Sequence, residues 1–256
     1  MKMKAMYYAA LMVAVVALLV ASVPVCASTM DARIESSARQ SYVFKTYLKD
    51  DDIKIQSKDG AVTLTGIVVN EFHKSLAEET MSGLPGVKSV DNRLELKGAP
   101  PTANSDAWLM DKVKVTLLFH RSVSAGNTDV DVKDGIVTLR GPATSLAQKE
   151  LTTEYTKDVE GVKEVKNEMT VIKASKKKRT VVEKIDDASI TAQVKMTLLF
   201  HRSTSALNTM VETKRGVVTL HGKARNEDEW NLAIKLANDV NGVKGVKNRM
   251  TIEESK

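Results

Sequence analysis

The chain of 256 residues is poor in cysteine, aromatic residues and histidine. It has one cysteine, 4% aromatic residues and four histidines. No carboxylate or second histidine stands at metal-ligand spacing around His120 or His201, and nothing resembles a nucleophile elbow, a phosphate-binding loop or a zinc motif. We therefore expect no catalytic residue, cofactor or metal. Aromatic residues that would stack on bases are sparse, which argues against a nucleic-acid partner.

What the chain has instead is a pattern of about 65 residues that occurs three times. The first motif, Gly-x-Val-Thr-Leu-x-Gly, occupies Gly60–Gly66, Gly135–Gly141 and Gly216–Gly222. The second, Gly-Val-Lys-x-Val-x-Asn, starts at Gly86, Gly161 and Gly242, in each copy 20 residues after the glycine that ends the first. The second and third copies also share Thr-Leu-Leu-Phe-His-Arg-Ser, at 116–122 and 197–203. Three small modules in series are typical of a binding protein rather than of an enzyme.

The first 27 residues have the features of a secretory signal peptide. A basic start precedes an apolar run over residues 9–23, and Pro24 should break the helix before cleavage after Ala27. The run is short for a membrane span, which needs roughly 17 to 25 apolar residues. A valine precedes Cys26, where a lipidation signal has a small residue. We predict export to the periplasm, without lipidation at Cys26 and without a retained N-terminal anchor.

The repeat divides the remaining chain into three domains joined by two linkers. We place domain 1 at 28–97, a proline-containing linker at 98–104, domain 2 at 105–173, a basic linker at 174–186 and domain 3 at 187–254. Residues 31–97 and 105–173 each have a net charge of −1, whereas 174–186 and 187–256 each carry +3. Two prolines stiffen the first linker, so we expect domain 1 to keep a fixed relation to domain 2 while domain 3 swings.

Each copy predicts the order helix–strand–strand–helix–strand. In the second copy Asp106 is a plausible N-cap of the first helix, and Asp134-Gly135 is a hairpin turn between two short strands. Ser145 opens the second helix with a capping box, and residues 165–171 alternate as a third strand. In the third copy Ile190, Val194 and Leu198 form a helical stripe. The fold class is α+β: three tandem small α-β-β-α-β sandwich domains after an N-terminal signal peptide.

Two recurring polar residues could be mistaken for functional sites. Asn92, Asn167 and Asn248 fall on the inward face of the last strand, where we expect each amide to bond backbone groups. His120 and His201 fall at the C-terminal end of the first helix, where the helix dipole favours cationic side chains. We favour this helix-end role over catalysis or metal binding.

The two glycine motifs, at fixed spacing and in three copies behind a signal peptide, resemble the BON (bacterial OsmY and nodulation) domain family over essentially the whole mature chain. The resemblance implies the fold order given above and a non-enzymatic envelope protein of Gram-negative bacteria, often periplasmic. It also implies a link to osmotic or envelope stress and to binding of anionic phospholipid. It brings no catalytic residues. BON domains usually come in pairs, so the third copy is a departure.

Basic residues of the third copy and of the linker before it are the candidate lipid-binding site. Relative to the second copy, the third has Arg215 in place of Asp134 and Arg249 in place of Glu168. Each such residue contributes roughly 1 kcal/mol near an anionic membrane, so several together predict weak, salt-sensitive binding. A short Lys/Arg run is also compatible with a solvated linker. The candidate residues are Lys176, Lys177, Lys178, Arg179, Arg202, Lys223, Arg225, Lys244, Lys247 and Arg249.

We therefore predict a periplasmic, non-enzymatic protein that supports envelope integrity under osmotic or envelope stress by peripheral binding of anionic phospholipid. One alternative is a periplasmic chaperone-like protein for unfolded clients, which would need an exposed apolar surface. Another is a scaffold that pairs its edge strands with other envelope proteins. The sequence leaves the oligomeric state and the packing of the three domains open.

Overall fold

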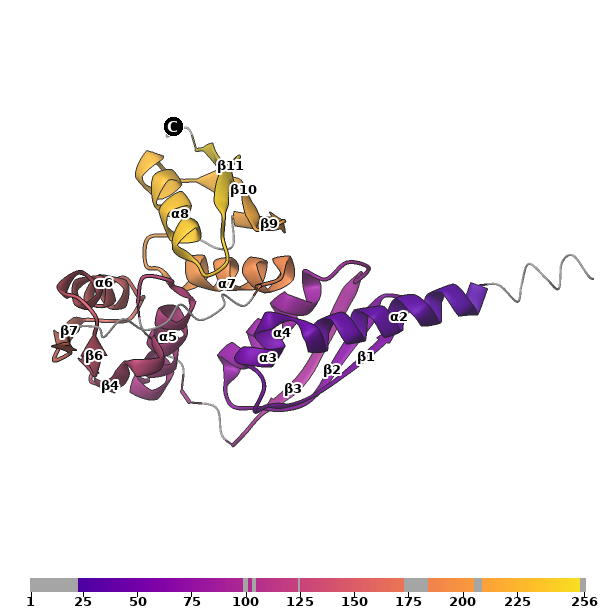
Figure 1. Ribbon diagram of the computed structural model, residues 1–256, viewed down its shortest axis with the longest axis horizontal. Helices are drawn as coiled ribbons and strands as arrows, with labels where there is room; N and C mark the ends of the chain where they lie inside the picture. The colour runs from indigo at the N-terminus through magenta and orange to yellow at the C-terminus, as the bar shows by residue number, and fades with distance from the viewer. Residues whose placement is uncertain are drawn as a thin grey trace, which may run out of the picture.

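The computed structural model describes residues 23–98, 101–102, 105–123, 125–172, 184–204 and 209–253, with side chains from residue 29 onward. It has three lobes, one for each copy of the repeat (Figure 1). In each lobe two helical segments pack on one face of a small sheet. The predicted order helix–strand–strand–helix–strand is confirmed in all three copies, and with it the α+β fold class.

Domain 1 is the indigo-to-purple lobe of Figure 1. Its elements are α2 (Val23–Gln40), the short α3 (Tyr42–Thr46), β1 (Asp52–Lys58), β2 (Ala61–Val68), α4 (Glu71–Ser82) and β3 (Ser89–Leu96). β1 and β2 form an antiparallel hairpin, and β3 pairs parallel with β2. The crossover through α4 joins the two parallel strands, as a parallel pair requires.

Domain 2 has the same topology with a third strand in two pieces. Its elements are α5 (Asp106–Phe119), the 3-10 turn η1 (Ala125–Asn127), β4 (Asp129–Lys133), β5 (Ile136–Arg140), β6 (Pro142–Ala143), α6 (Leu146–Lys157), β7 (Glu164–Asn167) and β8 (Thr170–Val171). β5 lies between β4 and β7, and β6 pairs parallel with β8. The predicted strand at 165–171 is thus interrupted between Asn167 and Thr170.

Domain 3, coloured orange to yellow in Figure 1, repeats this plan. Its elements are α7 (Asp187–Phe200), β9 (Thr209–Lys214), β10 (Val217–Ala224), α8 (Glu227–Asp239), β11 (Gly245–Asn248) and β12 (Thr251–Ile252). The predicted stripe Ile190, Val194 and Leu198 is buried against the sheet and α8.

The structure differs from the sequence prediction at Pro24. The described part of helix α2, Val23–Gln40, includes this proline and runs through the expected cleavage point after Ala27. Pro24 therefore does not break the helix ahead of that point. Residues 1–22, which hold most of the predicted signal peptide, lie outside the described residues, so the signal peptide stays a prediction.

The first aspartate of each repeat fixes the hairpin turn rather than the helix N-terminus. Ser105, not Asp106, is the N-cap of α5, accepting a hydrogen bond from the backbone N–H of Trp108. The Asp106 carboxylate instead accepts the backbone N–H groups of Asp134 and Gly135, at 2.6 and 2.9 Å. These bonds hold the pKa of Asp106 below its usual range. The equivalent carboxylates of domains 1 and 3 accept from the equivalent turns.

The inward asparagine of the last strand is structural, as predicted. In domain 2 the Asn167 amide group donates to the carbonyl of Lys149 on α6, and its carbonyl oxygen accepts from the backbone N–H of Met169. Asn92 and Asn248 make the same two kinds of bond in their own domains. Each asparagine therefore ties the third strand to the second helix of its domain.

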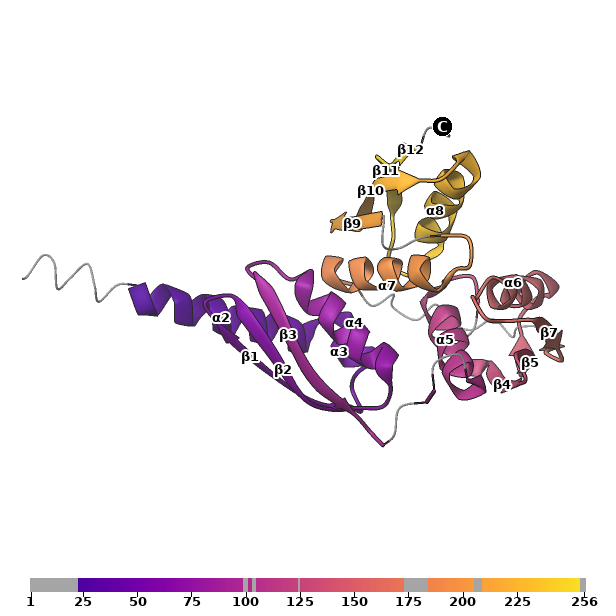
Figure 2. The ribbon, with the colours of Figure 1, turned by 180° about the vertical axis from the view of Figure 1, so that it is seen from behind.

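The three domains meet around α7, which lies between the sheet of domain 3 and the helices of the other two domains (Figures 1 and 2). A second stripe on α7, Ala188, Ala192, Met196 and Phe200, packs into the core of domain 1. Phe119 of α5 joins the same core and is fully buried. The expectation that domain 3 swings is therefore wrong in this structure, because its first helix is buried between the other two domains.

Gly141 follows β5, has a φ of 115° and lies close to the chain before β4. A substitution at Gly141 tests whether this close approach is needed for stability. A Cβ on Gly141 would overlap the carbonyl oxygen of Asn127. We expect Gly141→Ala to lower the free energy of unfolding by at least about 2 kcal/mol, measured by urea denaturation. Gly126→Ala is the control, because no atom lies within 4 Å of its added Cβ. Similar losses for the two variants would contradict this account.

Candidate functional site

The shared Phe-His-Arg-Ser segment is the place where domains 2 and 3 join. Each domain places the end of its first helix against the end of the other domain's second helix. The backbone N–H of Arg121 donates to the carbonyl of Asp239 at 3.0 Å, and that of Asn241 donates to the carbonyl of Phe119 at 2.9 Å. The same pair of bonds recurs with the domains exchanged. The backbone N–H of Arg202 donates to the carbonyl of Asp158, and that of Glu160 donates to the carbonyl of Phe200. The interface therefore has approximate two-fold symmetry within one chain.

The side chains of Arg121 and Arg202 also form hydrogen bonds across this interface. The guanidinium group of Arg121 donates to the carbonyls of Asn238 and Val243 in domain 3. The guanidinium group of Arg202 donates to the carbonyls of Lys157 and Val162 in domain 2. Carbonyl groups at a helix C-terminus lack intrahelical partners, so each arginine satisfies acceptors that its partner domain leaves open.

His120 lies in a hydrogen-bonded polar cluster at this interface. Its Nδ1 is 3.1 Å from Asp239 Oδ2, and its ring stacks on Tyr155 with the centroids 3.8 Å apart. The hydroxyl groups of Tyr155 and Ser122 each donate to Asp239 at 2.6 Å. Burial by itself would raise the pKa of Asp239, but the hydrogen bonds from His120, Ser122 and Tyr155 outweigh it and keep that pKa below its usual range.

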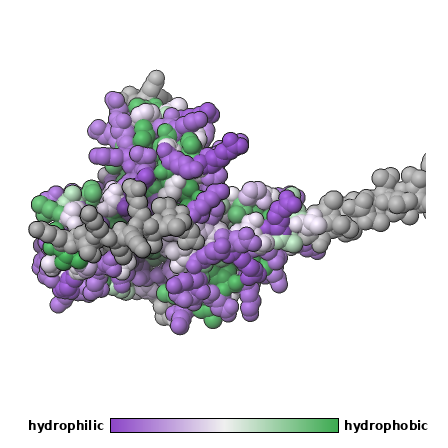
Figure 3. Space-filling model, in the orientation of Figure 1, coloured by the Kyte–Doolittle hydropathy of each residue, from purple (hydrophilic) through white to green (hydrophobic). Residues whose placement is uncertain are grey.

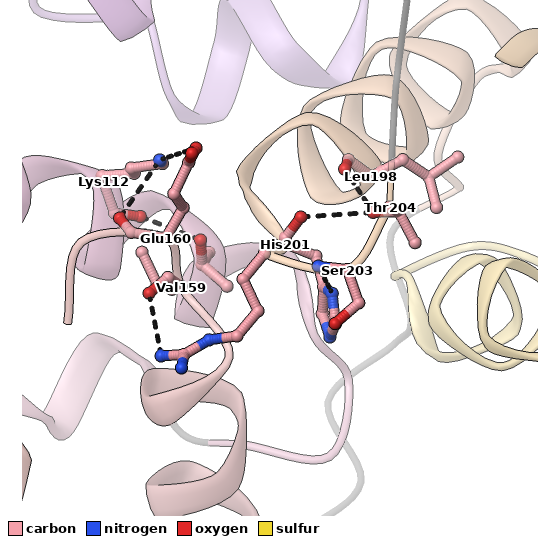
Figure 4. Close-up of polar contacts among 9 residues, drawn as sticks. Lys112, Val159, Glu160, Leu198, His201, Ser203 and Thr204 are labelled. Atoms are coloured by element: carbon pink, nitrogen blue, oxygen red, sulfur yellow. Dashed lines mark hydrogen bonds and ion pairs between the residues drawn. The ribbon is translucent and has the colours of Figure 1, made fainter. Parts of the chain in front are cut away.

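His201 occupies the equivalent position without an equivalent cluster. Its Nδ1 accepts the backbone N–H of Ser203 at 3.1 Å, so Nδ1 carries no proton (Figure 4). Its Nε2 is 3.5 Å from Asp158, a half-exposed carboxylate. Leu236 stands in domain 3 where domain 2 has Tyr155, so no hydroxyl group links this histidine to its aspartate. Burial lowers the pKa of His201, although Asp158 opposes that shift.

A buried lysine lies on the domain 1 side of the same interface. Lys112 on α5 is 2% exposed, and its ammonium group lies 3.3 Å from both the carbonyl and the carboxylate of Glu160 (Figure 4). The ammonium group also faces the rings of Trp108 and Phe200, at 4.7 and 5.6 Å from their centroids. Burial lowers the pKa of Lys112, although Glu160 opposes that shift. The side chain thus links residues of domain 2 to Phe200 of domain 3.

These contacts give the histidines a docking role at the helix ends. The sequence placed His120 and His201 correctly at the C-caps of α5 and α7. It missed their carboxylate partners, because Asp239 lies 119 residues from His120 and the two meet only through domain packing. Among the residues that the structure describes, no three histidine, cysteine or acidic side chains are grouped so that they could hold a metal.

The predicted basic residues of domain 3 fall on several surfaces. Lys223, Lys247 and Arg249 are exposed on the outer face of the sheet, opposite to the helices. Lys244 is exposed at the turn before β11. Arg202 instead contacts domain 2, and the Arg225 guanidinium group donates to Glu229 and to the carbonyl of Ser203. Lys176, Lys177, Lys178 and Arg179 lie outside the described residues.

The outer face of the domain 3 sheet is basic, and we call it the basic face. It carries Lys214, Lys223, Lys247 and Arg249 around Met210 and His221, with Glu212 as its one carboxylate among the described strands. Met210 is 61% exposed and pairs with His221 on the neighbouring strand. A solvent-exposed methionine surrounded by cations is an amphipathic surface.

The same face of domain 2 is not basic. Asp129 stands where domain 3 has Met210, and Glu164 where it has Gly245. Glu168 stands where domain 3 has Arg249, and its carboxylate pairs with Arg140 at 2.8 Å. Because the two domains share one backbone plan, this difference lies in the side chains alone.

Comparisons with known proteins agree with the fold and the repeat. The BON domain family matches this chain three times, over residues 30–98, 105–173 and 186–254. These matches cover most of the chain, which therefore belongs to the BON domain family. Among the described residues, no helix is both long and apolar enough to cross a membrane.

Two curated proteins are similar in sequence. Osmotically-inducible protein Y of Escherichia coli (strain K12) is 33% identical over 143 residues, which cover 54% of this chain and 71% of that protein. An uncharacterized protein in the gshII 5' region of Anaplasma centrale is 31% identical over 151 residues, or 59% of this chain and 97% of that protein. Among solved structures, one of CdsD, a structural protein of the type III secretion system of Chlamydia trachomatis, matches over 87% of this chain and 91% of the CdsD chain at 17% identity. Its TM-score is 0.26, which supports no inference.

The two interface aspartates provide a matched pair of mutations. Asp239→Asn removes a charge that accepts from Tyr155, Ser122 and His120, and we expect a loss of about 2–3 kcal/mol in the free energy of unfolding. Asp158→Asn changes a carboxylate with one long contact and should cost less than about 1 kcal/mol. Urea denaturation of the two variants measures the difference, and equal losses would show that the Tyr155 cluster adds nothing.

His201 should make stability depend on pH. Its folded pKa is below the ordinary value of about 6.5, so the unfolded chain binds a proton that the folded chain resists. Stability should therefore be insensitive to this residue above about pH 6.5 and fall as the pH drops below it. Asp158, Arg202 and His120 face the ring, and protonation also displaces the hydrogen bond from Ser203.

The measurement is the free energy of unfolding at pH 7 and pH 5 for the wild type and for His201→Leu. The substituted chain should lose less stability between the two pH values, because the other titrating groups are common to both proteins. An unchanged difference between pH 7 and pH 5 would refute the role of His201. His221→Leu, on the exposed sheet face, is the control for removing one histidine.

Proposed function

We propose that this chain is a non-enzymatic, exported protein of the bacterial envelope that supports envelope integrity under osmotic or envelope stress. It acts by binding anionic phospholipid peripherally through the basic face of domain 3. Lys244 and the linker residues Lys176–Arg179 add to the attraction. The sequence similarity to a protein named for osmotic induction supports the stress role.

The observation that carries the proposal is the contrast between domains 2 and 3. Three carboxylates of the domain 2 face, Asp129, Glu164 and Glu168, are replaced by methionine, glycine and arginine in domain 3. Lys247 lies on β11, Arg249 lies just after this strand, and both side chains are exposed. Cations near an anionic membrane gain roughly 1 kcal/mol each, whereas paired cations such as Arg140 are already neutralised.

The packing of the three domains strengthens this binding mode. Domain 3 is fixed to domain 2 by two arginine side chains and four backbone hydrogen bonds, so the basic face is presented by a rigid support. A preorganised surface loses less conformational entropy on binding than side chains on a mobile linker. Met210 can enter the interfacial layer of the bilayer while the surrounding lysines remain at the headgroups.

A chaperone-like role is the second candidate, because domain 2 has an exposed apolar edge. Leu146, Val171 and Ile172 are 61%, 45% and 49% exposed, and they lie near the paired ends of β6 and β8. Domains 1 and 3 have Glu71 and Glu227 at the position of Leu146. Hydrophobic residues are visible at this edge of domain 2 in Figure 3. Such an edge could bind apolar segments of unfolded clients.

Charge reversal on the basic face tests the lipid proposal. We expect Lys247→Glu to weaken co-sedimentation of the exported protein with phosphatidylglycerol vesicles about tenfold, and addition of Arg249→Glu to weaken it further. Binding by the wild type should also fall as salt rises, because screening shortens the range of the attraction. Vesicles of phosphatidylcholine should bind little in any condition.

Lys166→Glu is the matched control, because Lys166 occupies the position of Lys247 in domain 2 and the charge change is the same. This variant should bind nearly as well as the wild type. Equal effects of Lys166→Glu and Lys247→Glu would remove domain 3 as the binding domain. No binding by the wild type at any salt concentration would favour the chaperone-like role, which suppression of client aggregation then measures.

A further inference from the structure

A cavity of about 260 Å³ lies between domains 1 and 2. The start of α4 forms one wall, helix α5 forms another, and the segment from η1 to β4 completes the lining. Asn70, the N-cap of α4, donates from its side chain to the carboxylate of Asp111 on α5 at 3.1 Å, so the two walls are joined. The volume is just below the roughly 300–1,000 Å³ of pockets for drug-sized ligands, which indicates a smaller molecule.

A buried carboxylate orients His73 in the wall of this cavity. The Nδ1 atom of His73 lies 2.6 Å from Asp51, whose side chain is 1% exposed. An ionised carboxylate only accepts hydrogen bonds, so Nδ1 carries a proton and Nε2 is an acceptor in the neutral ring. Nε2 has no hydrogen-bond partner among the described residues. A histidine held in this way presents one free nitrogen atom in a fixed orientation.

The equivalent residue of the other two domains has a structural task. Gln148 stands where domain 1 has His73, and its side chain accepts the backbone N–H of Thr144 at 2.7 Å. Glu229 makes the same bond in domain 3, from the backbone N–H of Arg225 at 2.6 Å. These bonds resemble a capping box, in which the third helical residue reaches back to the chain before the helix.

Domain 1 gives this task to Asp51 instead. The equivalent backbone N–H, that of Val69, donates to Asp51 at 2.8 Å. Domain 2 has Gly126 at the position of Asp51. The start of α4 therefore needs nothing from residue 73, and the same aspartate that replaces the cap also fixes the histidine ring. Both changes serve the cavity rather than the helix.

Helix α5 adds one charge of each sign to the cavity. Asp111 and Lys114 both line it, and their spacing of three residues places them on one face of the helix. Asp111 is half-buried and Lys114 is exposed, and neither forms an ion pair with a described residue. The half-buried Leu118, one turn after Lys114, adds apolar surface. The cavity thus combines an acceptor nitrogen, a carboxylate and an ammonium group.

We propose that this cavity binds a small dipolar molecule that carries both an ammonium group and a carboxylate, such as a free amino acid. The ammonium group donates to His73 Nε2 and to Asp111, and the carboxylate pairs with Lys114. A simple anion would leave Asp111 without a partner, and a simple cation would leave Lys114 without one. The ligand touches both α4 and α5, so it joins domain 1 to domain 2. This inference is independent of the proposed function, which uses the outer face of domain 3.

The test is calorimetry of the exported protein with glycine, β-alanine and 4-aminobutyrate, which carry the two charges at increasing separation. At least one of these probes should bind with one molecule per chain. Propylamine and propionate each carry only one of the charges and should bind at least tenfold more weakly than the best probe. The N-trimethyl derivative of that probe should lose at least as much affinity, because it has no N–H to donate to His73.

Two substitutions locate the binding site. His73→Gln should weaken binding of the best probe at least tenfold and should fold normally, because domain 2 has a glutamine at this position. Asp111→Asn should also weaken it at least tenfold, because the partner charge of the ammonium group is lost. His221→Gln is the matched control, since it makes the same substitution on the outer sheet face of domain 3, and it should change the affinity by less than about twofold.

Three outcomes would overturn the inference: no binding of any of the three probes by the wild type, unchanged affinity of His73→Gln, or binding of propionate as tight as that of the best probe, which would identify a simple anion site at Lys114. Vesicle co-sedimentation separates the inference from the proposed function. His73→Gln should bind vesicles like the wild type, and Lys247→Glu should keep the affinity for the best probe. Either proposal can therefore fail while the other stands.

Discussion

The burial of α7 on nearly every side is the constraint on which the rest of the structure depends. One stripe of this helix, with Ile190 and Val194, packs on the sheet of domain 3, and a second stripe, with Ala192 and Phe200, packs into domain 1. A helix that is apolar all round is stable only where other elements cover all its faces. A domain of about 65 residues cannot cover them alone, so the other two domains supply the missing contacts.

The exchange of hydrogen bonds between domains 2 and 3 then fixes their orientation. Apolar packing is not directional, whereas the bonds from Arg121 and Arg202 to carbonyl groups of the partner domain hold one geometry. Domain 1 has Lys45 and Thr46 in place of the histidine and arginine, so it cannot take part in the exchange. It packs through α3 and α4 instead, with Glu79 paired to Lys195 at 2.5 Å.

Divergence between the copies is concentrated where the shared backbone plan leaves side chains free. The turn aspartate and the strand asparagine are the same in all three domains because each satisfies buried or strained backbone groups. The outer sheet faces differ, since side chains there satisfy no buried backbone group. In domain 3 this face became cationic, whereas in domain 2 the end near Leu146 became apolar. One scaffold thus supports surfaces of different chemistry.

The sequence by itself determined the repeat, the order of elements and the outward direction of Lys247 and Arg249. These follow from local rules: turn glycines, N-caps and the two-residue period of a strand. Only the tertiary structure decided that domain 3 is docked, that Asp239 meets His120 and that Arg202 contacts domain 2. Such contacts join residues far apart in the chain, and no local pattern specifies them. The stripe containing Ala192 and Phe200 was the one available signal, because its apolar residues lie on a face that the domain's own sheet cannot cover.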